Sequence, residues 1–145
     1  MSMTVKQHTD SWSKSAHESM ISVGVLLKNK RKIEALFFGH LAIEKILKSM
    51  LAAKRLPIPR GRQGHDLVFL ANTVGLQLTP DERNELNTIT SFNIEARYAI
   101  YKQNLYQQCT PQYLNQWITC IRKWYKFIKQ LVSQERTTLP NNTQM

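Results

Sequence analysis

Hydrophobic positions recur with a helical period along most of the chain, and the clearest case is the segment from Glu34 to Ala53. This segment contains no proline and few β-branched residues, and it is rich in strong helix formers. One helical face collects the apolar side chains of Leu36, Ile43, Leu47 and Met50. A helix of this composition is too apolar to lie alone on a surface and too polar to span a membrane. We therefore predict the central helix of a bundle, with His40, Glu44 and Lys45 near its packed region.

A first helix is predicted before this segment, because apolar residues from Trp12 to Leu27 also follow a helical period. Asp10 is the expected N-cap, and the basic stretch Lys28–Lys32 suits a helix C-terminus. Since the central helix follows almost at once, the two helices should form an antiparallel hairpin. The segment Lys54–Gly64 contains two prolines, two glycines and four basic residues, which predicts a loop.

Capping signals mark the remaining helices. Asp66 is predicted to start a short third helix, which Gly75 ends at the C′ position. The sequence Thr79–Glu82 is a capping box with proline at the first helical position, and it opens a fourth helix. From Asn93 to Tyr98 the pattern is compatible with a continued helix or with a bend. The pair Thr110-Pro111 opens a last helix, whose apolar face comprises Leu114, Trp117, Ile121, Trp124, Ile128 and Leu131.

These elements predict an all-α fold, an antiparallel helical bundle of four to five helices plus short helices. Residues 1–145 fit a single domain, because a chain of this length can bury a sizeable core. From about Ser133 the sequence is polar, and this C-terminal tail is expected to be frayed.

Net charge narrows the choice of partners more than overall composition does. The chain has 20 Lys and Arg against 10 Asp and Glu, so its net charge of +10 favours polyanions. Cys109 and Cys120 have no Cys or His at metal-ligand spacing, so neither a disulfide framework nor a zinc site is indicated. The N-terminus lacks the apolar core of a signal peptide, and no apolar run reaches membrane-spanning length. We therefore expect a cytoplasmic protein with no membrane association, no metal site and no cofactor.

Two short motifs stand out in the chain. The first, in the central helix, has the sequence Ala42-x-Glu44-Lys45-x-Leu47-Lys48, and the second is Ala96-Arg97-Tyr98. Both resemble motifs of the HEPN domain family, the higher eukaryotes and prokaryotes nucleotide-binding domains. Together with the helical hairpin and the later His65-Asp66-Leu67, they extend the resemblance from about Trp12 to Leu131. The resemblance implies a HEPN-like antiparallel helical bundle that forms a homodimer.

The same resemblance implies a partner and an activity. Many HEPN proteins are paired with a separately encoded small nucleotidyltransferase, and a subset are metal-independent ribonucleases. In those ribonucleases an arginine is followed, four to six residues later, by a histidine. Arg97 takes the arginine position here, whereas Lys102, Gln103 and Asn104 stand where the histidine is expected. Because an amide does not titrate, and a lysine titrates near neutrality only when its pKa is strongly lowered, the ribonuclease motif is incomplete.

These positions predict a site that binds a nucleotide or RNA without assigning any catalytic residue. Arg97 is expected to grip a phosphate, because its planar guanidinium suits that geometry. Tyr98 or Tyr101 would offer a stacking face for a base. The full set of candidate binding residues is Arg97, Tyr98, Tyr101, Lys102, His40 and Glu44.

Each candidate also has a purely structural interpretation. Arg97 would then bridge helices through Glu95 or Glu44, and the tyrosines would be core or dimer contacts. His40 and Glu44, four residues apart on one helix, would form a satisfied buried pair rather than part of a metal site. His65 either caps the helix that follows or reaches the cleft, and capping is the preferred interpretation.

Three classes of function follow from these alternatives. The first is a nucleotide- or RNA-binding protein without its own catalysis, which acts with a small nucleotidyltransferase as a toxin–antitoxin-like pair. The second is a metal-independent ribonuclease toxin with a substituted general base, for which Lys102 and His40 are the first suspects. The third is a purely structural dimerisation module. The missing histidine favours the first class over the second, and the positive charge favours it over the third.

Overall fold

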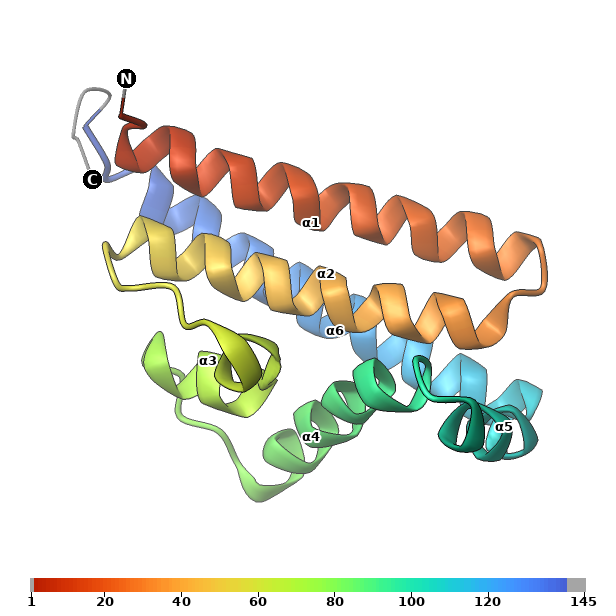
Figure 1. Cartoon of the computed structure of the whole chain (residues 1–145). Coiled ribbons are helices and arrows are strands. Elements are labelled where there is room, and N and C mark those ends of the chain that lie inside the picture. Colours follow the sequence, from red (N-terminus) through yellow and green to blue (C-terminus); the bar gives the residue numbers. More distant parts are fainter. Residues whose placement is uncertain (1, 141–145) are drawn as a thin grey trace.

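The computed structural model describes residues 2–140, and it confirms the all-α fold class (Figure 1). Within this range the chain forms six α-helices and one 3₁₀-helix, η1. Their bounds are α1 (Val5–Lys28), α2 (Lys32–Ala53), η1 (Gly61–His65), α3 (Leu67–Thr73), α4 (Pro80–Glu95), α5 (Ala99–Gln108) and α6 (Pro111–Arg136).

The predicted central helix is confirmed as α2, which contacts every other α-helix of the bundle. α1 runs antiparallel beside it as the predicted hairpin, α6 packs along it, and α3, α4 and α5 cover the rest of it (Figure 1). Leu36, Ile43 and Leu47 on the predicted apolar face are fully buried. Burial of each such side chain stabilises the fold by about 1.5–3 kcal/mol. α2 is therefore the element against which the other helices are positioned.

α1 begins at Val5, so the predicted N-cap at Asp10 was wrong. Thr4 is the N-cap: its side chain accepts a hydrogen bond from the Gln7 N–H, and the Gln7 side chain accepts one from the Thr4 N–H. This capping box satisfies two N–H groups at the start of the helix. Asp10 lies in the second turn of α1 instead, and its carboxylate pairs with Arg136 of α6.

The other predicted caps are confirmed. Asp66, Thr79 and Thr110 each accept a hydrogen bond from a backbone N–H three residues later, at the starts of α3, α4 and α6. Gly75 follows α3 with a φ of +92°, as expected for a glycine at C′. These caps fix both ends of α3 and the starts of α4 and α6.

The last helix is longer than predicted. α6 continues to Arg136 rather than fraying from Ser133, because the Arg136 side chain pairs with Asp10 and ties the last turn to α1. Residues 141–145 of the predicted tail lie outside the described residues. The cations between Arg122 and Lys129 are exposed, whereas Ile121, Trp124 and Ile128 are buried, so this run is an amphipathic helix.

The segment from Asn93 to Tyr98 bends rather than continuing as one helix. α4 ends at Glu95, Arg97 lies in the turn that follows, and Tyr98 has extended backbone before α5. α4 is held to α6 by the edge-to-face contact of Phe92 with Trp117 and by a 2.9 Å hydrogen bond from Trp124 to Glu85. The bend therefore places Arg97 directly after α4, whose position is fixed by these contacts with α6.

Candidate functional site

The buried carboxylate of Glu44 connects α2 to the loop before α3. Its Oε2 atom accepts a hydrogen bond from Lys48 Nζ at 2.7 Å, and its Oε1 atom accepts one from His65 Nδ1 at 2.9 Å. Glu44 and Lys48 are 5% and 7% exposed, so solvent screens this ion pair little. Because a carboxylate only accepts, Nδ1 of His65 donates this hydrogen bond, and Nε2 is left for another contact. Glu44 thus sets the orientation of the His65 ring.

The backbone of η1 is positioned by one hydrogen bond to α2 and by a close approach to the loop before it. His40 Nε2 donates a hydrogen bond to the carbonyl of His65 at 2.9 Å. Gly64 is buried, and a Cβ atom at this position would lie 2.8 Å from the Pro59 carbonyl oxygen, closer than real Cβ contacts come. Glycine is therefore required where η1 passes this carbonyl, and the close approach fixes the position of His65.

His40 lies completely buried beneath this loop. Desolvation by burial lowers the pKa of its ring below the ordinary value of 6.5, so the ring is neutral at pH 7. Its Nδ1 atom has no hydrogen-bond partner among residues 2–140. The 3.9 Å between His40 Nε2 and Glu44 Oε1 is too long for a hydrogen bond. His40 and Glu44 therefore hold different atoms of His65 rather than each other.

A cleft of about 570 Å³ opens between η1 and the C-terminal half of α4. Its lining residues are Arg62, His65, Asp66, Thr90, Asn93, Ile94, Arg97 and Tyr98. The carboxylate of Asp66 is engaged as the N-cap of α3, where it accepts from the Phe69 N–H at 3.1 Å. The lining thus contains two guanidinium groups and one carboxylate, and this carboxylate already accepts a hydrogen bond from the backbone of α3. The cleft suits an anionic ligand, and its volume lies in the range of small-molecule sites.

Arg97 and Tyr98 line one side of this cleft, and Tyr101 packs against Tyr98 outside the lining. Arg97 Nε donates to the Asn93 carbonyl at 3.0 Å, which leaves the other guanidinium N–H groups for a ligand. The guanidinium carbon lies 6.0 Å from the centre of the Tyr98 ring, and Tyr98 and Tyr101 meet edge to face at 6.3 Å. The two tyrosines are 54% and 50% exposed, so each offers a ring face for stacking.

Lys102 lies apart from this cleft lining. Its ammonium is 3.7 Å from the carboxylate of Glu34 on α2. The pKa of Glu34 is lowered mainly by a hydrogen bond from Arg31, with a smaller contribution from Lys102. Of the six candidate binding residues, the structure therefore brings Arg97 and Tyr98 together in the cleft, with Tyr101 against Tyr98.

His40 and Glu44 reach the cleft only through His65, which lines it; the preferred interpretation of His65 as a helix cap was wrong, and the alternative that it reaches the cleft is confirmed. Its ring does not cap α3, because Asp66 does, and it binds Glu44 instead. The signal for this role was the adjacent Asp66, which is the better N-cap and leaves the His65 ring free for another contact. Arg62 was not singled out, because one arginine in a basic loop has no periodic signal that places it.

The predicted structural bridge through Arg97 is not present in the described chain. Among residues 2–140, neither Glu44 nor Glu95 forms an ion pair with Arg97. Burial raises the pKa of Glu95, which has a Ser91 side chain rather than a cation beside it. Arg97 is exposed, and its guanidinium is held by a hydrogen bond to the Asn93 carbonyl in the last turns of α4.

Residues 2–140 contain neither a cluster of metal ligands nor a membrane-spanning helix. In that part of the chain no group of three or more His, Cys, Asp and Glu is arranged to hold a metal ion. None of the helices in residues 2–140 combines the length and the apolarity needed to cross a bilayer.

The fold and the cleft define an all-α protein with a basic candidate binding site at the corner between α4 and α5. A family model for the HEPN domain matches residues 9–131, and the chain belongs to the HEPN domain family. Neither the curated proteins nor the solved structures compared with the chain gave a match. Membership supports a function related to nucleotides or RNA at the level of the family.

Proposed function

We propose that the cleft between η1 and α4 binds a nucleotide or a short segment of RNA. The observation that carries this proposal is that Arg62, Arg97 and the half-exposed Tyr98 line one cleft. Guanidinium groups bind phosphate oxygens through charge-assisted hydrogen bonds, and an exposed aromatic ring stacks on a base. His65, whose ring is fixed by Glu44, adds a polar contact at the cleft floor.

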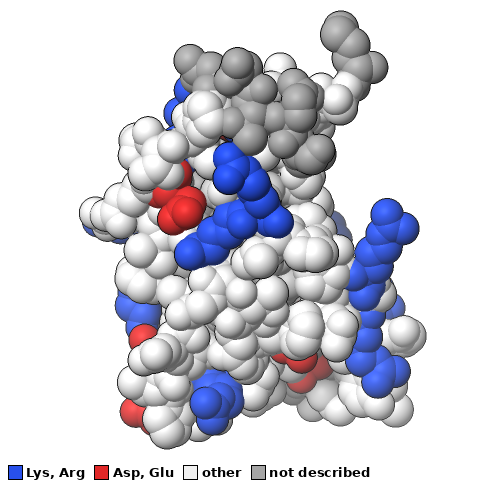
Figure 2. All heavy atoms as spheres, turned by 90° about the vertical axis from the view of Figure 1, so that its left-hand side faces the viewer, with Lys and Arg blue, Asp and Glu red and all other residues white. Residues whose placement is uncertain are grey.

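The charge around the cleft supports an anionic ligand. The segment Lys54–Arg62, which leads into η1, contains four basic residues and no acidic one. Figure 2 views the end of the bundle where α2 passes into this segment, and lysine and arginine side chains predominate over acidic ones there. A strand of RNA leaving the cleft over this surface would gain affinity by release of counterions.

The protein is further proposed to lack RNA cleavage of its own and to act with a small nucleotidyltransferase as a toxin–antitoxin-like pair. At the positions where family ribonucleases have histidine, Lys102 lies beside a carboxylate and Gln103 and Asn104 carry amides that do not titrate. The nucleotidyltransferase partner and the cytoplasmic location rest on the family resemblance and the sequence alone. Co-purification with the product of an adjacent reading frame tests this partner. The pairing is refuted if the co-purified protein is not a nucleotidyltransferase.

A homodimer through α4 and α5 is the proposed assembly. Large apolar side chains are exposed on these two helices and the turn between them, at Ile94, Tyr98, Ile100, Tyr101 and Tyr106. A two-fold interface on this surface would place two equivalent clefts near the axis. Sedimentation equilibrium at micromolar concentration should give twice the chain mass of 16.9 kDa. A monomer at moderate salt would contradict this assembly.

The binding proposal is tested by titrating nucleotides and short RNAs into wild-type protein, Arg97→Ala and Arg83→Ala at physiological salt. Arg83 is the matched control, since it is an exposed arginine on α4, the helix that precedes Arg97, and lies outside the cleft lining. Loss of a charge-assisted contact should weaken binding by about 1.5–3 kcal/mol for Arg97→Ala, and far less for Arg83→Ala. If both variants lose the same affinity, binding depends only on the overall positive charge and not on the cleft. If the wild-type protein binds neither nucleotides nor RNA, a purely structural dimerisation module is favoured.

A second candidate function, metal-independent RNA cleavage, is favoured by the pair of Glu44 and His65. A carboxylate that holds one nitrogen of a histidine leaves the other nitrogen to take a proton from a nucleophile. His65 is a better base than the two suspects named from the sequence, because His40 is fully buried and Lys102 faces Glu34. Labelled RNA incubated with EDTA distinguishes the proposals. We expect no cleavage, whereas cleavage lost in both Arg97→Ala and His65→Ala would establish the ribonuclease.

A further inference from the structure

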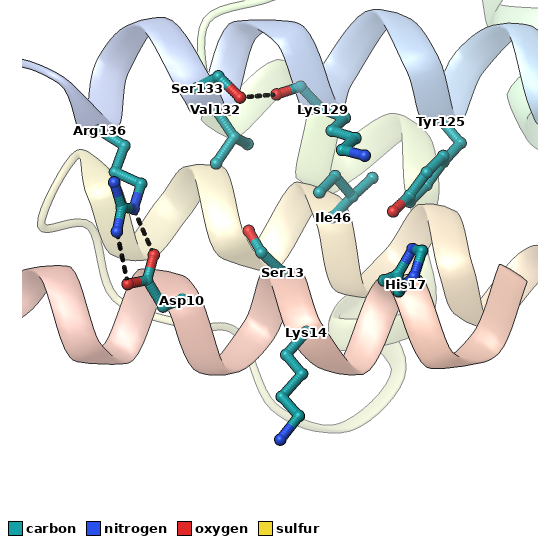
Figure 3. Close-up of a pocket in the computed structure, with 10 residues that line it drawn as sticks. All are labelled: Asp10, Ser13, Lys14, His17, Ile46, Tyr125, Lys129, Val132, Ser133 and Arg136. Atoms are coloured by element: carbon teal, nitrogen blue, oxygen red, sulfur yellow. Dashed lines mark hydrogen bonds and ion pairs between the residues drawn. The ribbon is translucent and has the colours of Figure 1, made fainter. Parts of the chain in front are cut away.

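A second cavity, of about 530 Å³, lies in the groove between α1 and α6. Figure 3 shows α6 along one wall, α1 along the other, and Ile46 of α2 behind them. Asp10 and Arg136 close one end through two parallel hydrogen bonds between carboxylate and guanidinium. Away from this pair, the groove walls carry Tyr125, Lys129 and His17 (Figure 3). This groove shares no lining residue with the cleft at Arg97.

The two serines in the groove, Ser13 and Ser133, already donate their hydroxyl protons to hydrogen bonds within the protein. Ser49 donates its hydroxyl proton to the Thr9 carbonyl at 2.8 Å, so Ser13 must be the donor in the 2.6 Å contact between Ser13 and Ser49. Ser133 donates to the Lys129 carbonyl at 3.1 Å. Asp10 is likewise committed, because both of its carboxylate oxygens accept from Arg136. The serine protons and the Asp10 carboxylate are therefore not available to a ligand without loss of an existing bond.

Three side chains that can still donate a hydrogen bond lie near one another in the groove: Tyr125, Lys129 and His17 (Figure 3). The hydroxyl of Tyr125 is buried, has no hydrogen-bond partner within residues 2–140, and points from α6 toward α1 (Figure 3). The Lys129 ammonium lies 5.9 Å from the centre of the Tyr125 ring and forms no ion pair with any carboxylate of the described chain. His17 faces the tyrosine hydroxyl from α1 (Figure 3). A buried hydroxyl without a protein partner is costly, so a ligand atom that accepts its proton would be stabilised here.

We propose that the groove between α1 and α6 binds the phosphate group of a small phosphorylated molecule. A phosphate presents several acceptor oxygens, which match the Tyr125 hydroxyl, the Lys129 ammonium and a ring N–H of His17. The nearby carboxylate of Asp10 does not repel it strongly, because Arg136 neutralises that charge. Since the cavity is several times larger than a phosphate ion, the rest of the ligand also lies in the groove.

The test uses inorganic phosphate and pyrophosphate as probes, with thermal shift and calorimetric titration as readouts. The variants are Tyr125→Phe, Lys129→Gln and the matched control Lys126→Gln, an exposed lysine on the same helix outside the groove. Tyr125→Phe removes only the unpartnered hydroxyl, so the unliganded variant should melt no lower than wild type. Each groove variant should weaken pyrophosphate binding about tenfold or more, because each removes a hydrogen bond to a charged group.

Arg97→Ala distinguishes this groove from the proposed nucleotide cleft. Pyrophosphate binding that persists in Arg97→Ala and Lys126→Gln but is lost in Tyr125→Phe and Lys129→Gln establishes the groove as a separate site. The proposal is overturned if millimolar pyrophosphate gives no saturable binding, or if Lys126→Gln loses as much affinity as Lys129→Gln. It is also overturned if Arg97→Ala removes all binding, since the cleft alone would then account for the anion.

Discussion

The substitution Glu44→Gln removes the one negative charge that holds both Lys48 and His65. The amide keeps the size of the carboxylate and can still accept a hydrogen bond from His65, so the main change is loss of charge. Lys48, 7% exposed and 2.7 Å from the Glu44 carboxylate in the wild type, then becomes a buried ammonium without a counterion. Breaking a buried pair in this way destabilises a protein by about 3–5 kcal/mol.

That magnitude is a large part of the stability of a domain of this size, for which about 5–15 kcal/mol is typical. We therefore expect Glu44→Gln to lower the midpoint of thermal unfolding by about 6–20 °C. Urea titration followed by circular dichroism gives the free energy of unfolding directly. Glu18→Gln is the control, because Glu18 is exposed on α1, and its loss should stay within about 0.5 kcal/mol.

The double variant Glu44→Met/Lys48→Met separates stability from binding. Removing both charges should recover most of the lost stability, since a buried ion pair is often replaced by apolar side chains without cost. His65 keeps an acceptor in Glu44→Gln but loses it in the double variant, so binding at the cleft should be weakened in the double variant even though its stability recovers. The reasoning is refuted if Glu44→Gln costs no more than Glu18→Gln, because the Glu44 charge would then not be coupled to Lys48.

Three smaller predictions follow from the same region and from the helix ends. Gly64→Ala should weaken nucleotide binding and lower the melting temperature, because its Cβ would displace η1 from the Pro59 carbonyl; unchanged binding would mean that η1 does not position the cleft. The lowered pKa of His40 means that the unfolded chain takes up a proton first as the pH falls below 6.5, so stability should fall there by up to about 1.4 kcal/mol per pH unit. Urea titrations from pH 7 to pH 5 should show this slope flattened in His40→Gln, and an equal slope would assign it to other groups. Lys30→Gly should raise the free energy of unfolding by about 0.5–1 kcal/mol by urea titration, because Lys30 has a φ of +59° that glycine adopts without strain; a loss of stability would contradict this.

The helices were predictable from the sequence because apolar periodicity and capping residues are local signals. Gly75 identified one helix end, and the structure confirms it. Lys30 and Arg55 occupy the equivalent left-handed position after α1 and α2, with the same pair of backbone hydrogen bonds at each helix end. Those two ends gave no glycine signal, so only the basic stretch and the loop composition indicated them.

The candidate site was predictable only in part, because its contacts join segments far apart in the chain. Arg97 and Tyr98 came from one motif, and the bend after α4 exposes both of them beside one cleft. The hydrogen bond between Glu44 and His65 crosses 21 residues, and the ion pair between Asp10 and Arg136 crosses 126. No periodic or capping pattern encodes such distances, and Asp10 and His65 were both assigned local helix-capping roles instead.

The central claim is that the cleft at Arg97 is where a nucleotide or RNA binds, and amide NMR spectra recorded during an RNA titration test it most directly. A short single-stranded RNA is added to isotope-labelled protein at physiological salt, with Arg97→Ala and Arg83→Ala measured in parallel. The account predicts saturable shifts confined to the residues around His65, Thr90, Asn93 and Arg97, which are abolished in Arg97→Ala and kept in Arg83→Ala. Shifts spread evenly over the exposed lysines of α6, or unchanged by Arg97→Ala, would contradict it.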